Sequence, residues 1–311
     1  MEKVIVTGGA GFIGSHLCEL LLSRGYFVYC VDNLLTGSER NIKYLLNNPN
    51  FRFIKFDVTQ SRLPIDEANY VFHLASPASP ADFKNLSEEI VLVNSLGTLN
   101  LLRFSQKNGA RFLLASTSEV YGDAKEHPQK ETYWGYANSY GARSCYDESK
   151  RFGEALAYVF SHKYNLDLRI IRIFNTYGPR MRRDDGRVIS NFINQAIEEK
   201  PITVYGKGDH SRSFCYVSDL VAGIEKVMFT PGMAGEVFNL GNPEEYKIID
   251  LAEKIKKMTG SSSEIVFKNL PEDDPVQRCP DISKIKKTVG WEPKVGVNEG
   301  LAKTIEYYKS L

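Results

Sequence analysis

A glycine-rich turn near the N-terminus constrains this chain more than any other feature. Gly8, Gly11 and Gly14 follow the apolar run Lys3–Thr7 and precede a stretch of helical character that begins at about Gly14. Glycines allow a sharp turn between a strand and a helix, and they leave the N–H groups of the helix N-terminus open to an anion. The pattern therefore predicts a strand–turn–helix unit that can hold a pyrophosphate.

Short β-rich runs alternate with longer helical stretches after this turn, which predicts βαβ units and a parallel sheet. The predicted fold is α/β, a Rossmann-type doubly wound parallel sheet with a smaller C-terminal α/β substrate domain. We assign 1–174 and about 215–241 to the sheet domain, and about 175–214 and 242–311 to the smaller one. We expect strands at Lys3–Thr7, Val28–Asp32, Phe51–Asp57, Tyr70–Leu74, Phe112–Ser116, Leu168–Phe174 and Val237–Gly241, and helices near Glu88–Lys107 and Ser218–Phe229.

The second predicted strand ends in an acidic residue, Asp32. A carboxylate at this point can accept both ribose hydroxyls of an adenosine, and it repels a 2′-phosphate, which favours NAD over NADP. Asp57 closes the third strand and could hold the adenine edge, although an ordinary strand-end role is an equal alternative. A glycine turn alone is weak evidence, but the complete strand, turn, helix and acidic strand end predict NAD binding.

A phenol and an ammonium stand four residues apart at Tyr146 and Lys150, and therefore on one face of a helix. The charge of Lys150 should favour the phenolate of Tyr146, because a phenol with its ordinary pKa of about 10 is a poor base near neutrality. Tyr146 could then remove a hydroxyl proton while hydride leaves the same carbon. Surface packing of a tyrosine on a lysine is the alternative for this motif alone.

The segment Ser116–Gly122 follows a predicted strand, so its polar side chains should lie at the carboxyl edge of the sheet, where open α/β folds bind ligands. Glu119 would add a second acid–base group, which implies proton chemistry at a carbon beside the oxidised one. A solvent-exposed glutamate on a loop is the alternative.

Composition narrows the function further. The net charge of +1 over 311 residues leaves no basic block for nucleic acid or for a membrane surface. No apolar stretch reaches the roughly 20 residues that span a bilayer. The five cysteines form no CxxC pair and the histidines show no ligand spacing, so we expect neither disulfides nor a metal site. A reducing cytosol is the simplest location.

Taken together, Gly8–Gly14, Asp32, Ser116–Gly122 and Tyr146–Lys150 resemble the extended short-chain dehydrogenase/reductase superfamily that acts on nucleotide sugars. The resemblance runs almost end to end and is strongest to its UDP-glucuronate decarboxylases. The segments that carry this match are His73–Pro80, Ala115–Asp123, Cys145–Arg151, Arg172–Met181, Asp185–Val188, Thr203–Gly206 and Asn239–Glu244.

This resemblance implies a closed catalytic cycle. NAD oxidises the sugar at C4, the resulting β-keto acid loses CO2, and the bound NADH reduces the ketone again. Tyr146 would serve as base and later as acid, Lys150 would hold the nicotinamide ribose, and Glu119 would assist proton movement at C5. Thr117 and Ser118 would hydrogen-bond the reacting oxygens.

The resemblance also implies ligand-binding residues and a homodimer formed by the helices near Glu88–Lys107 and Tyr146–His162. Beside Tyr146 and Lys150, the implied cofactor-binding residues are Gly8, Gly11, Phe12, Ile13, Gly14, Asp32, Asn33, Thr36, Gly37, Asp57, Val58, Leu74 and Ser76. The implied substrate-binding residues, which would contact a UDP-sugar, are Asn175, Arg187, Tyr205, Arg212 and Arg278.

Two other functions stay open: a nucleotide-sugar 4,6-dehydratase or 4-epimerase, and an NAD-binding regulator without turnover. Dehydratases of this superfamily carry an aspartate where this chain has Ser118, and epimerases usually carry a small residue where it has Glu119, so both positions favour decarboxylation. Two departures concern the sugar site. Leu92 replaces a lysine of the decarboxylases, and Ser139–Arg143 replaces a proline-bearing segment.

Overall fold

The computed structural model describes residues 1–270 and 277–311. Its centre is a seven-stranded sheet with the strand order β11-β6-β5-β4-β1-β2-β3, in which every neighbouring pair runs parallel. The predicted Rossmann-type parallel sheet is confirmed. Its strands are β1 (Lys3–Thr7), β2 (Phe27–Asp32), β3 (Phe51–Lys55), β4 (Tyr70–His73), β5 (Arg111–Thr117), β6 (Leu168–Ile173) and β11 (Val237–Leu240).

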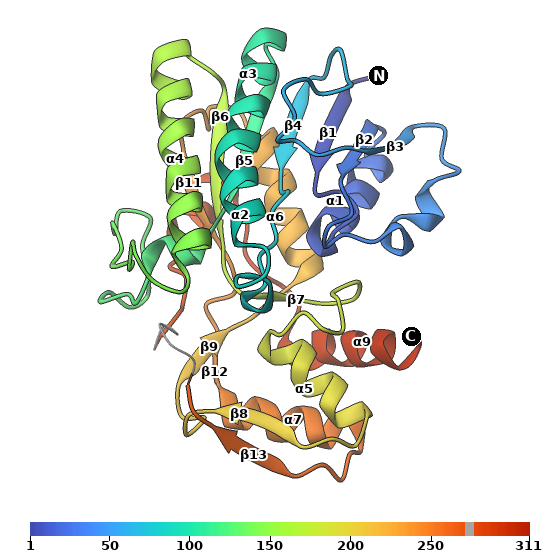
Figure 1. The fold of residues 1–311 in the computed structure, drawn as a ribbon, viewed down its shortest axis with the longest axis vertical. Helices are drawn as coiled ribbons and strands as arrows, with labels where there is room; N and C mark the ends of the chain where they lie inside the picture. The colour runs from blue at the N-terminus through green and yellow to red at the C-terminus, as the bar shows by residue number, and fades with distance from the viewer. Residues whose placement is uncertain (271–276) are drawn as a thin grey trace.

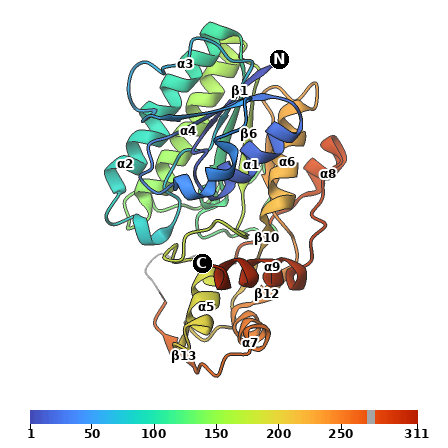
Figure 2. The ribbon, with the colours of Figure 1, turned by 90° about the vertical axis from the view of Figure 1, so that its right-hand side faces the viewer.

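Helices cover both faces of this sheet (Figures 1 and 2). On one face lie α1 (Phe12–Ser23) and α6 (Val217–Phe229), and on the other lie α3 (Thr98–Asn108) and α4 (Ser144–Tyr164). Successive residues of a strand point to opposite faces, so Val4 and Val6 belong to one hydrophobic core and Ile5 to the other. Burial on both faces explains why the strands are almost continuously apolar.

The helix predicted near 88–107 is interrupted. It consists of α2 (Ser87–Leu92), a π-helical turn at Val93–Gly97, and α3. The buried Asn94 lies in this turn, and its amide donates to the hydroxyls of Ser76 and Ser149, each at 3.1 Å. A π turn inserts an extra residue into a helix and often marks a functional site. Here it joins α2–α3 to the segments that line the candidate site.

A second lobe lies beyond the carboxyl ends of the sheet strands (Figure 1). Its helices are α5 (Val188–Ile197), α7 (Ile248–Thr259) and α9 (Val297–Lys309). Its strand pairs are β8 (Ile202–Tyr205) with β13 (Ile265–Lys268), and β9 (Ser211–Ser213) with β12 (Glu245–Lys247). The short strands β7 (Thr176–Tyr177) and β10 (Cys215–Tyr216) pair where the chain passes between the lobes.

The C-terminal segment does not stay in the second lobe. Helix α8 (Ser283–Val289) packs against β11 of the large sheet, and the Trp291 indole donates to the carbonyl of Asp219 in α6 at 2.9 Å. Part of the segment assigned to the smaller domain therefore covers the sheet. The domain boundaries given above stay a prediction.

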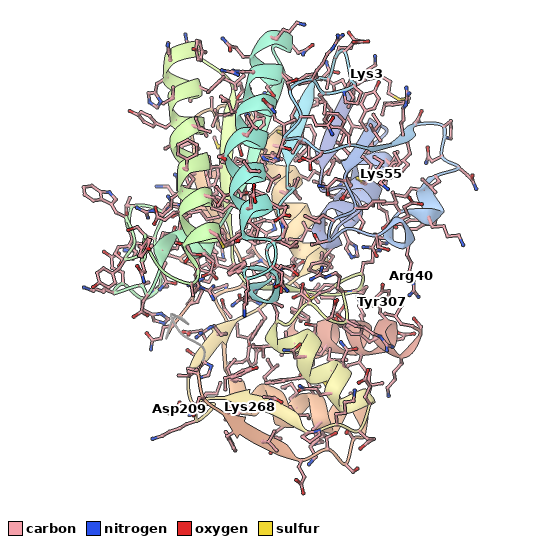
Figure 3. All side chains as sticks on the ribbon, in the orientation of Figure 1. Lys3, Arg40, Lys55, Asp209, Lys268 and Tyr307 are labelled. Carbon is pink, nitrogen blue, oxygen red and sulfur yellow. The ribbon has the colours of Figure 1, made fainter. Side chains whose placement is uncertain are left out.

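Charged side chains of both signs cover the outside of both lobes, and Arg40, Lys55, Asp209 and Lys268 are labelled examples in Figure 3. Among residues 1–270 and 277–311, no helix has both the length and the apolar character that crossing a membrane requires.

Candidate active site

A cavity of about 470 Å³ lies between the carboxyl edge of the sheet and the second lobe. The structure brings all the predicted site residues to its walls, although their individual roles stay predictions. These are Gly8, Gly11, Phe12, Ile13, Gly14, Asp32, Asn33, Thr36, Gly37, Asp57, Val58, Leu74, Ser76, Thr117, Ser118, Glu119, Tyr146, Lys150, Asn175, Arg187, Tyr205, Arg212 and Arg278.

The glycine turn fits a diphosphate closely. Gly8 has φ +69°, a conformation that favours glycine, and a Cβ on it would lie 2.9 Å from the backbone of Ala75. A Cβ on Gly14 would lie 2.0 Å from the carbonyl oxygen of Gly8. Because these positions exclude side chains, the N-terminus of α1 stays open toward the cavity, where its N–H groups can meet an anion.

Asp32 lies at the end of β2 and is buried. Its carboxylate accepts hydrogen bonds from the N–H groups of Ala10 at 3.0 Å and Leu34 at 2.8 Å. Burial raises its pKa, although these N–H donors lower it in part. Ribose hydroxyls would supply further donors to the same carboxylate. The glycine turn and Asp32 together fit a dinucleotide with a free 2′-hydroxyl.

Asp57 has local partners in this structure. Its carboxylate accepts from the amide of Asn33 at 3.0 Å and from the hydroxyl of Thr59 at 2.7 Å. These bonds order the end of the groove beyond Asp32. A direct contact between Asp57 and adenine stays a prediction.

Tyr146 and Lys150 occupy the first turns of α4 and are both buried. The ammonium of Lys150 donates to the carbonyl of Ala115 at 2.9 Å and lies 5.7 Å from the centroid of the Tyr146 ring. Burial raises the pKa of Tyr146 to about 12, although a hydrogen bond with Thr117 lowers it in part. Burial likewise lowers the pKa of Lys150 to about 7.

The raised pKa of Tyr146 differs from the expectation that the charge of Lys150 favours the phenolate. The reason is that Lys150 is buried as deeply as Tyr146, so desolvation disfavours the charged form of each. Without ligands, both groups are held toward neutral forms.

Glu119 is a mostly buried ion-pair partner, with 17% of its side chain exposed, and not a solvent-exposed loop residue. It lies in a short 3-10 helix, Ser118–Tyr121, that follows β5 directly. Its two carboxylate oxygens lie 2.7 Å from Arg143 and 2.5 Å from Arg278. Burial by itself raises the pKa of Glu119, but the two guanidinium groups outweigh it and hold the pKa at about 2. Glu119 is therefore a carboxylate at neutral pH.

The network around Glu119 includes two residues that sequence reasoning missed as site residues, Arg143 and Asp147. Arg143 Nε lies 3.9 Å from the Asp147 carboxylate, and one Asp147 oxygen is buried with no hydrogen-bond partner. Burial, with a contribution from the Glu119 charge, raises the pKa of Asp147 to about 7. The only signal in the sequence is that Asp147 directly follows Tyr146, the predicted catalytic residue.

Three arginines from separate segments line the cavity: Arg187, Arg212 and Arg278. Arg187 precedes α5 and pairs with Asp185 at 3.1 Å, while Arg212 comes from β9. The guanidinium of the buried Arg278 donates to the hydroxyl of Ser118 at 3.2 Å. Planar guanidinium groups that converge from separate segments suit a diphosphate.

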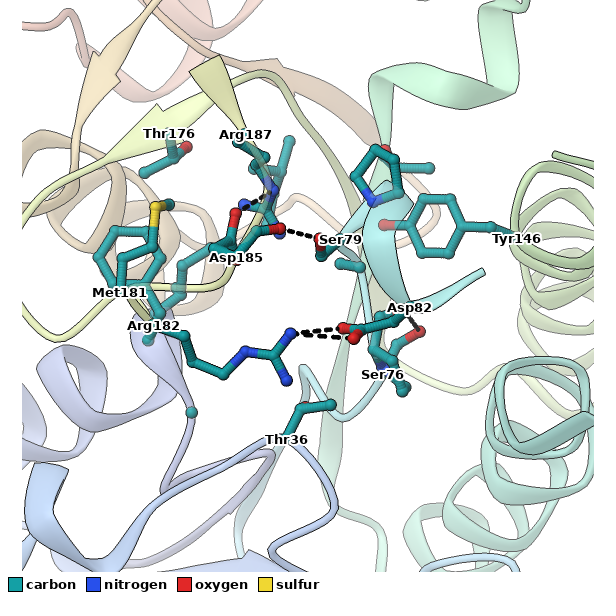
Figure 4. Close-up of a pocket in the computed structure, with 18 of the residues that line it drawn as sticks. Thr36, Ser76, Ser79, Asp82, Tyr146, Thr176, Met181, Arg182, Asp185 and Arg187 are labelled. Atoms are coloured by element: carbon teal, nitrogen blue, oxygen red, sulfur yellow. Dashed lines mark hydrogen bonds and ion pairs between the residues drawn. The ribbon is translucent and has the colours of Figure 1, made fainter. Parts of the chain in front are cut away.

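An ion pair spans the cavity. Arg182 donates to both carboxylate oxygens of Asp82, each at 2.9 Å, and the hydroxyl of Ser79 donates to the carbonyl of Asp185 close by (Figure 4). Asp82 and Ser79 belong to the segment after β4, whereas Arg182 and Asp185 belong to the segment before α5. We call the Arg182–Asp82 pair the clasp. No sequence pattern indicated it.

The two segments in which the sequence differs from the decarboxylases, at Leu92 and at Ser139–Arg143, each contribute a residue to the cavity wall. Leu92 lines the cavity with 40% of its surface exposed and contributes no charge there. In the segment Ser139–Arg143, Arg143 pairs with Glu119, whereas the side chain of Tyr140 is 98% exposed.

Known proteins similar in sequence to this chain match it over nearly its whole length. The chain is 49% identical over 308 residues to UDP-glucuronic acid decarboxylase 1 of Arabidopsis thaliana, a match covering 99% of this chain and 70% of that protein. It is 47% identical over 308 residues to the protein of the same name from Xenopus tropicalis, covering 99% of this chain and 72% of that protein.

Solved structures give the same fold. UDP-glucuronic acid 4-epimerase from Bacillus cereus, in complex with UDP-glucuronic acid and NAD, superposes with a TM-score of 0.90 at 32% identity over 99% of both chains. A dTDP-glucose 4,6-dehydratase from Bacillus anthracis in complex with NAD gives 0.87 at 26% identity, covering 100% of this chain and 97% of that one. The GDP-mannose 4,6 dehydratase family model matches residues 5–304. The chain therefore belongs to this family, within the extended short-chain dehydrogenases/reductases.

Proposed function

We propose that this chain is an NAD-dependent decarboxylase that converts UDP-glucuronate to UDP-xylose. The identity of 47–49% to decarboxylases of that name, over 99% of the chain, supports the reaction. The observation that carries the chemistry is the arrangement of Ser118, Glu119 and Arg278 beside Tyr146 at one end of the cavity.

The hydrogen bond between Ser118 and Arg278 favours decarboxylation over dehydration. Ser118 offers a hydroxyl next to a buried guanidinium, which suits a substrate with a carboxylate at C5. It offers no acid to protonate a departing hydroxyl, as a 4,6-dehydratase requires. Epimerisation at C4 is the second candidate, because the Bacillus cereus epimerase of the same fold is described with UDP-glucuronic acid.

The glycine turn, Asp32 and Lys150, which line the cavity, would hold NAD, and the bound cofactor would supply hydride transfer from and back to C4 of the sugar. Tyr146, hydrogen-bonded to Thr117, would have to act as a phenolate to take the proton from O4 during oxidation, and as a phenol it would give the proton back during reduction. The buried Lys150 would hold the nicotinamide ribose. Once C4 is a ketone, the bond from C5 to its carboxylate would break, CO2 would leave, and the electron pair would enter the ketone to form an enolate. The enolate would take a proton from water at C5, which restores the ketone before its reduction.

Glu119 has a narrower role in this scheme than a general acid. A carboxyl group with a pKa of about 2 carries no proton to donate near neutrality. We therefore assign Glu119 to holding Arg278 against Ser118 and, at most, to accepting a proton.

A homodimer also belongs to this proposal. Helices α2 and α4 pack side by side, and exposed apolar side chains lie on both: Val91 on α2, Phe152 and Val159 on α4. A second copy of the chain would cover this face. We further propose a cytosolic location, which the free cysteines Cys18, Cys30, Cys145, Cys215 and Cys279 support.

Proton NMR of the purified protein incubated with UDP-glucuronate and a trace of NAD tests the reaction. We expect UDP-xylose and CO2 to form without stoichiometric NADH. UDP-galacturonate as the product would favour the epimerase instead. If UDP-glucuronate stays unchanged while NAD binds, the decarboxylase proposal is wrong, and UDP-glucose or dTDP-glucose becomes the next substrate to test.

A further inference from the structure

Three potential metal ligands converge outside the catalytic residues. His127 lies in the loop between β5 and α4, Glu245 begins β12, and Cys279 follows the catalytic-site residue Arg278. His127 Nε2 lies 2.9 Å from Glu245 Oε2, and the ligand atoms of all three residues lie within 4.8 Å of one another. Within residues 1–270 and 277–311, no other group of three such side chains is arranged to hold a cation.

The backbone holds these three residues in place. The N–H of Cys279 donates to the amide oxygen of Gln129 at 2.8 Å, and the N–H of Gln129 donates to the carbonyl of Cys279 at 2.9 Å. The loop that carries His127 is thereby tied to the segment that carries Cys279. Ligands on a paired backbone lose little conformational entropy when they bind an ion.

Glu245 is oriented as well. Strand β12 pairs with β9, and the hydroxyl of Ser211 donates to Glu245 Oε1 at 2.5 Å. Its other oxygen, Oε2, faces His127. Metal-binding carboxylates commonly have such an outer hydrogen-bond partner, which sets their orientation.

We propose that His127, Glu245 and Cys279 bind a zinc-class divalent cation, one that prefers nitrogen and sulfur ligands. Bonds of about 2.0 Å to nitrogen and oxygen and about 2.3 Å to sulfur place tetrahedral ligand atoms roughly 3–4 Å apart. The observed spacing reaches this range through small side-chain movements, in which His127 and Glu245 separate slightly. The exposed fractions of these two side chains, 35% and 27%, leave a fourth position for water.

The charges balance in this site. In the structure the thiol of Cys279 donates to the carbonyl of Pro243 at 3.4 Å. Metal binding would displace this thiol proton, which would leave to solvent. The thiolate and the carboxylate then neutralise the dication. A thiolate and an imidazole select zinc or cobalt over magnesium and calcium, which prefer oxygen ligands.

The site would also connect to catalysis. Cys279 is covalently next to Arg278, which contacts both Ser118 and Glu119. A bound cation would fix the position of the segment that carries Cys279 and Arg278. Occupancy is therefore expected to change turnover under the proposed function, but the binding test below does not depend on any activity.

Cobalt titration of the metal-free protein tests the site. Tetrahedral Co²⁺ with a thiolate ligand gives visible ligand-field bands and a near-ultraviolet charge-transfer band from sulfur to cobalt. We expect both to appear with one equivalent of Co²⁺, to disappear when Zn²⁺ is added, and to persist in excess Mg²⁺. Cys279→Ser should lose the charge-transfer band, whereas Cys145→Ser, which removes the partly exposed cysteine of α4, should keep it.

The remaining two ligands require separate variants. His127→Gln and Glu245→Gln should each weaken cobalt binding at least tenfold, with thermal unfolding in the absence of metal used to confirm that the variants fold. A charge-transfer band that survives in Cys279→Ser, cobalt binding unchanged in both other variants, or no tetrahedral spectrum in the parent protein would each overturn the proposal.

Discussion

At the scale of single residues, burial dominates the candidate site. Burial holds Tyr146 and Lys150 toward neutral forms, with pKa values of about 12 and about 7. Glu119 is less deeply buried and stays ionised, because the charges of two arginines lower the pKa of its carboxyl group. Groups with such displaced pKa values are common in catalytic sites. Tyr146 and Lys150 each give a separate expectation for mutagenesis.

Tyr146→Phe removes only the hydroxyl that would exchange a proton with O4 of the sugar. We expect kcat to fall by about 10²–10⁴-fold, the usual contribution of a positioned acid–base group, while NAD binding and the melting temperature change little. Product formation by NMR and cofactor binding by fluorescence measure the two effects. Turnover at the parental rate would remove Tyr146 from the mechanism.

Lys150→Met should raise the stability of the ligand-free protein while it impairs turnover. The folded state holds the pKa of Lys150 at about 7, below its usual value of 10.5, so the charged lysine destabilises the fold. This cost is full below pH 7, decreases as pH rises, and vanishes above the unfolded pKa. The gain in melting temperature should therefore be larger at pH 6 than at pH 9. An equal gain at both pH values would contradict the assigned cause.

At the scale of elements, segments from the two lobes meet across the cavity. The segment after β4 supplies Ser79 and Asp82, and the segment before α5 supplies Arg182 and Asp185 (Figure 4). Both segments line the cavity that also contains the glycine turn and Tyr146. We therefore expect the clasp to influence how readily a ligand enters or leaves the cavity.

Asp82→Asn weakens the clasp and should accelerate exchange of bound cofactor. A partly buried ion pair contributes about 1 kcal/mol, which corresponds to about a fivefold faster exchange. Displacement of bound NADH by excess NAD, followed by fluorescence, measures this rate. Arg24→Ala is the control, because it breaks the ion pair with Glu225 on the outside of the sheet domain. If Asp82→Asn and Arg24→Ala exchange cofactor equally slowly, the clasp does not retain it.

At the scale of the whole molecule, the surface feature that bears on assembly is the exposed apolar face formed by α2 and α4. Phe152 on α4 has 51% of its surface exposed, and Val91 and Val159 lie on the same two helices. An apolar face of this kind is typical of a subunit interface. The two-lobed fold by itself does not require a second copy.

Phe152→Asp should convert the proposed dimer to a monomer, because it places a charge in the apolar interface. Sedimentation equilibrium at several protein concentrations gives the mass. Phe267→Asp is the matched control, since Phe267 is similarly exposed but lies on β13 in the second lobe. A parent protein that sediments as a monomer, or a Phe152→Asp variant that stays dimeric, would contradict this interface.

Local sequence patterns predicted the sheet well. The range predicted for β1 was Lys3–Thr7, which is the strand observed, whereas the third strand ends at Lys55 and not at Asp57. The helix expected near 88–107 failed at Val93–Gly97, where the backbone adopts a π turn. Periodicity could not reveal this turn, because Asn94 is held there by Ser76 and Ser149 from other segments.

The sequence by itself determined the parallel α/β fold, the glycine turn, Asp32 and the Tyr146–Lys150 pair, since each depends on residues close together in the chain or on alternation along it. Only the tertiary structure decided the partners of Glu119, the clasp and the convergence of His127, Glu245 and Cys279. These contacts join residues far apart in the chain. Their spacing carries no period, and only the tertiary fold brings them within contact distance.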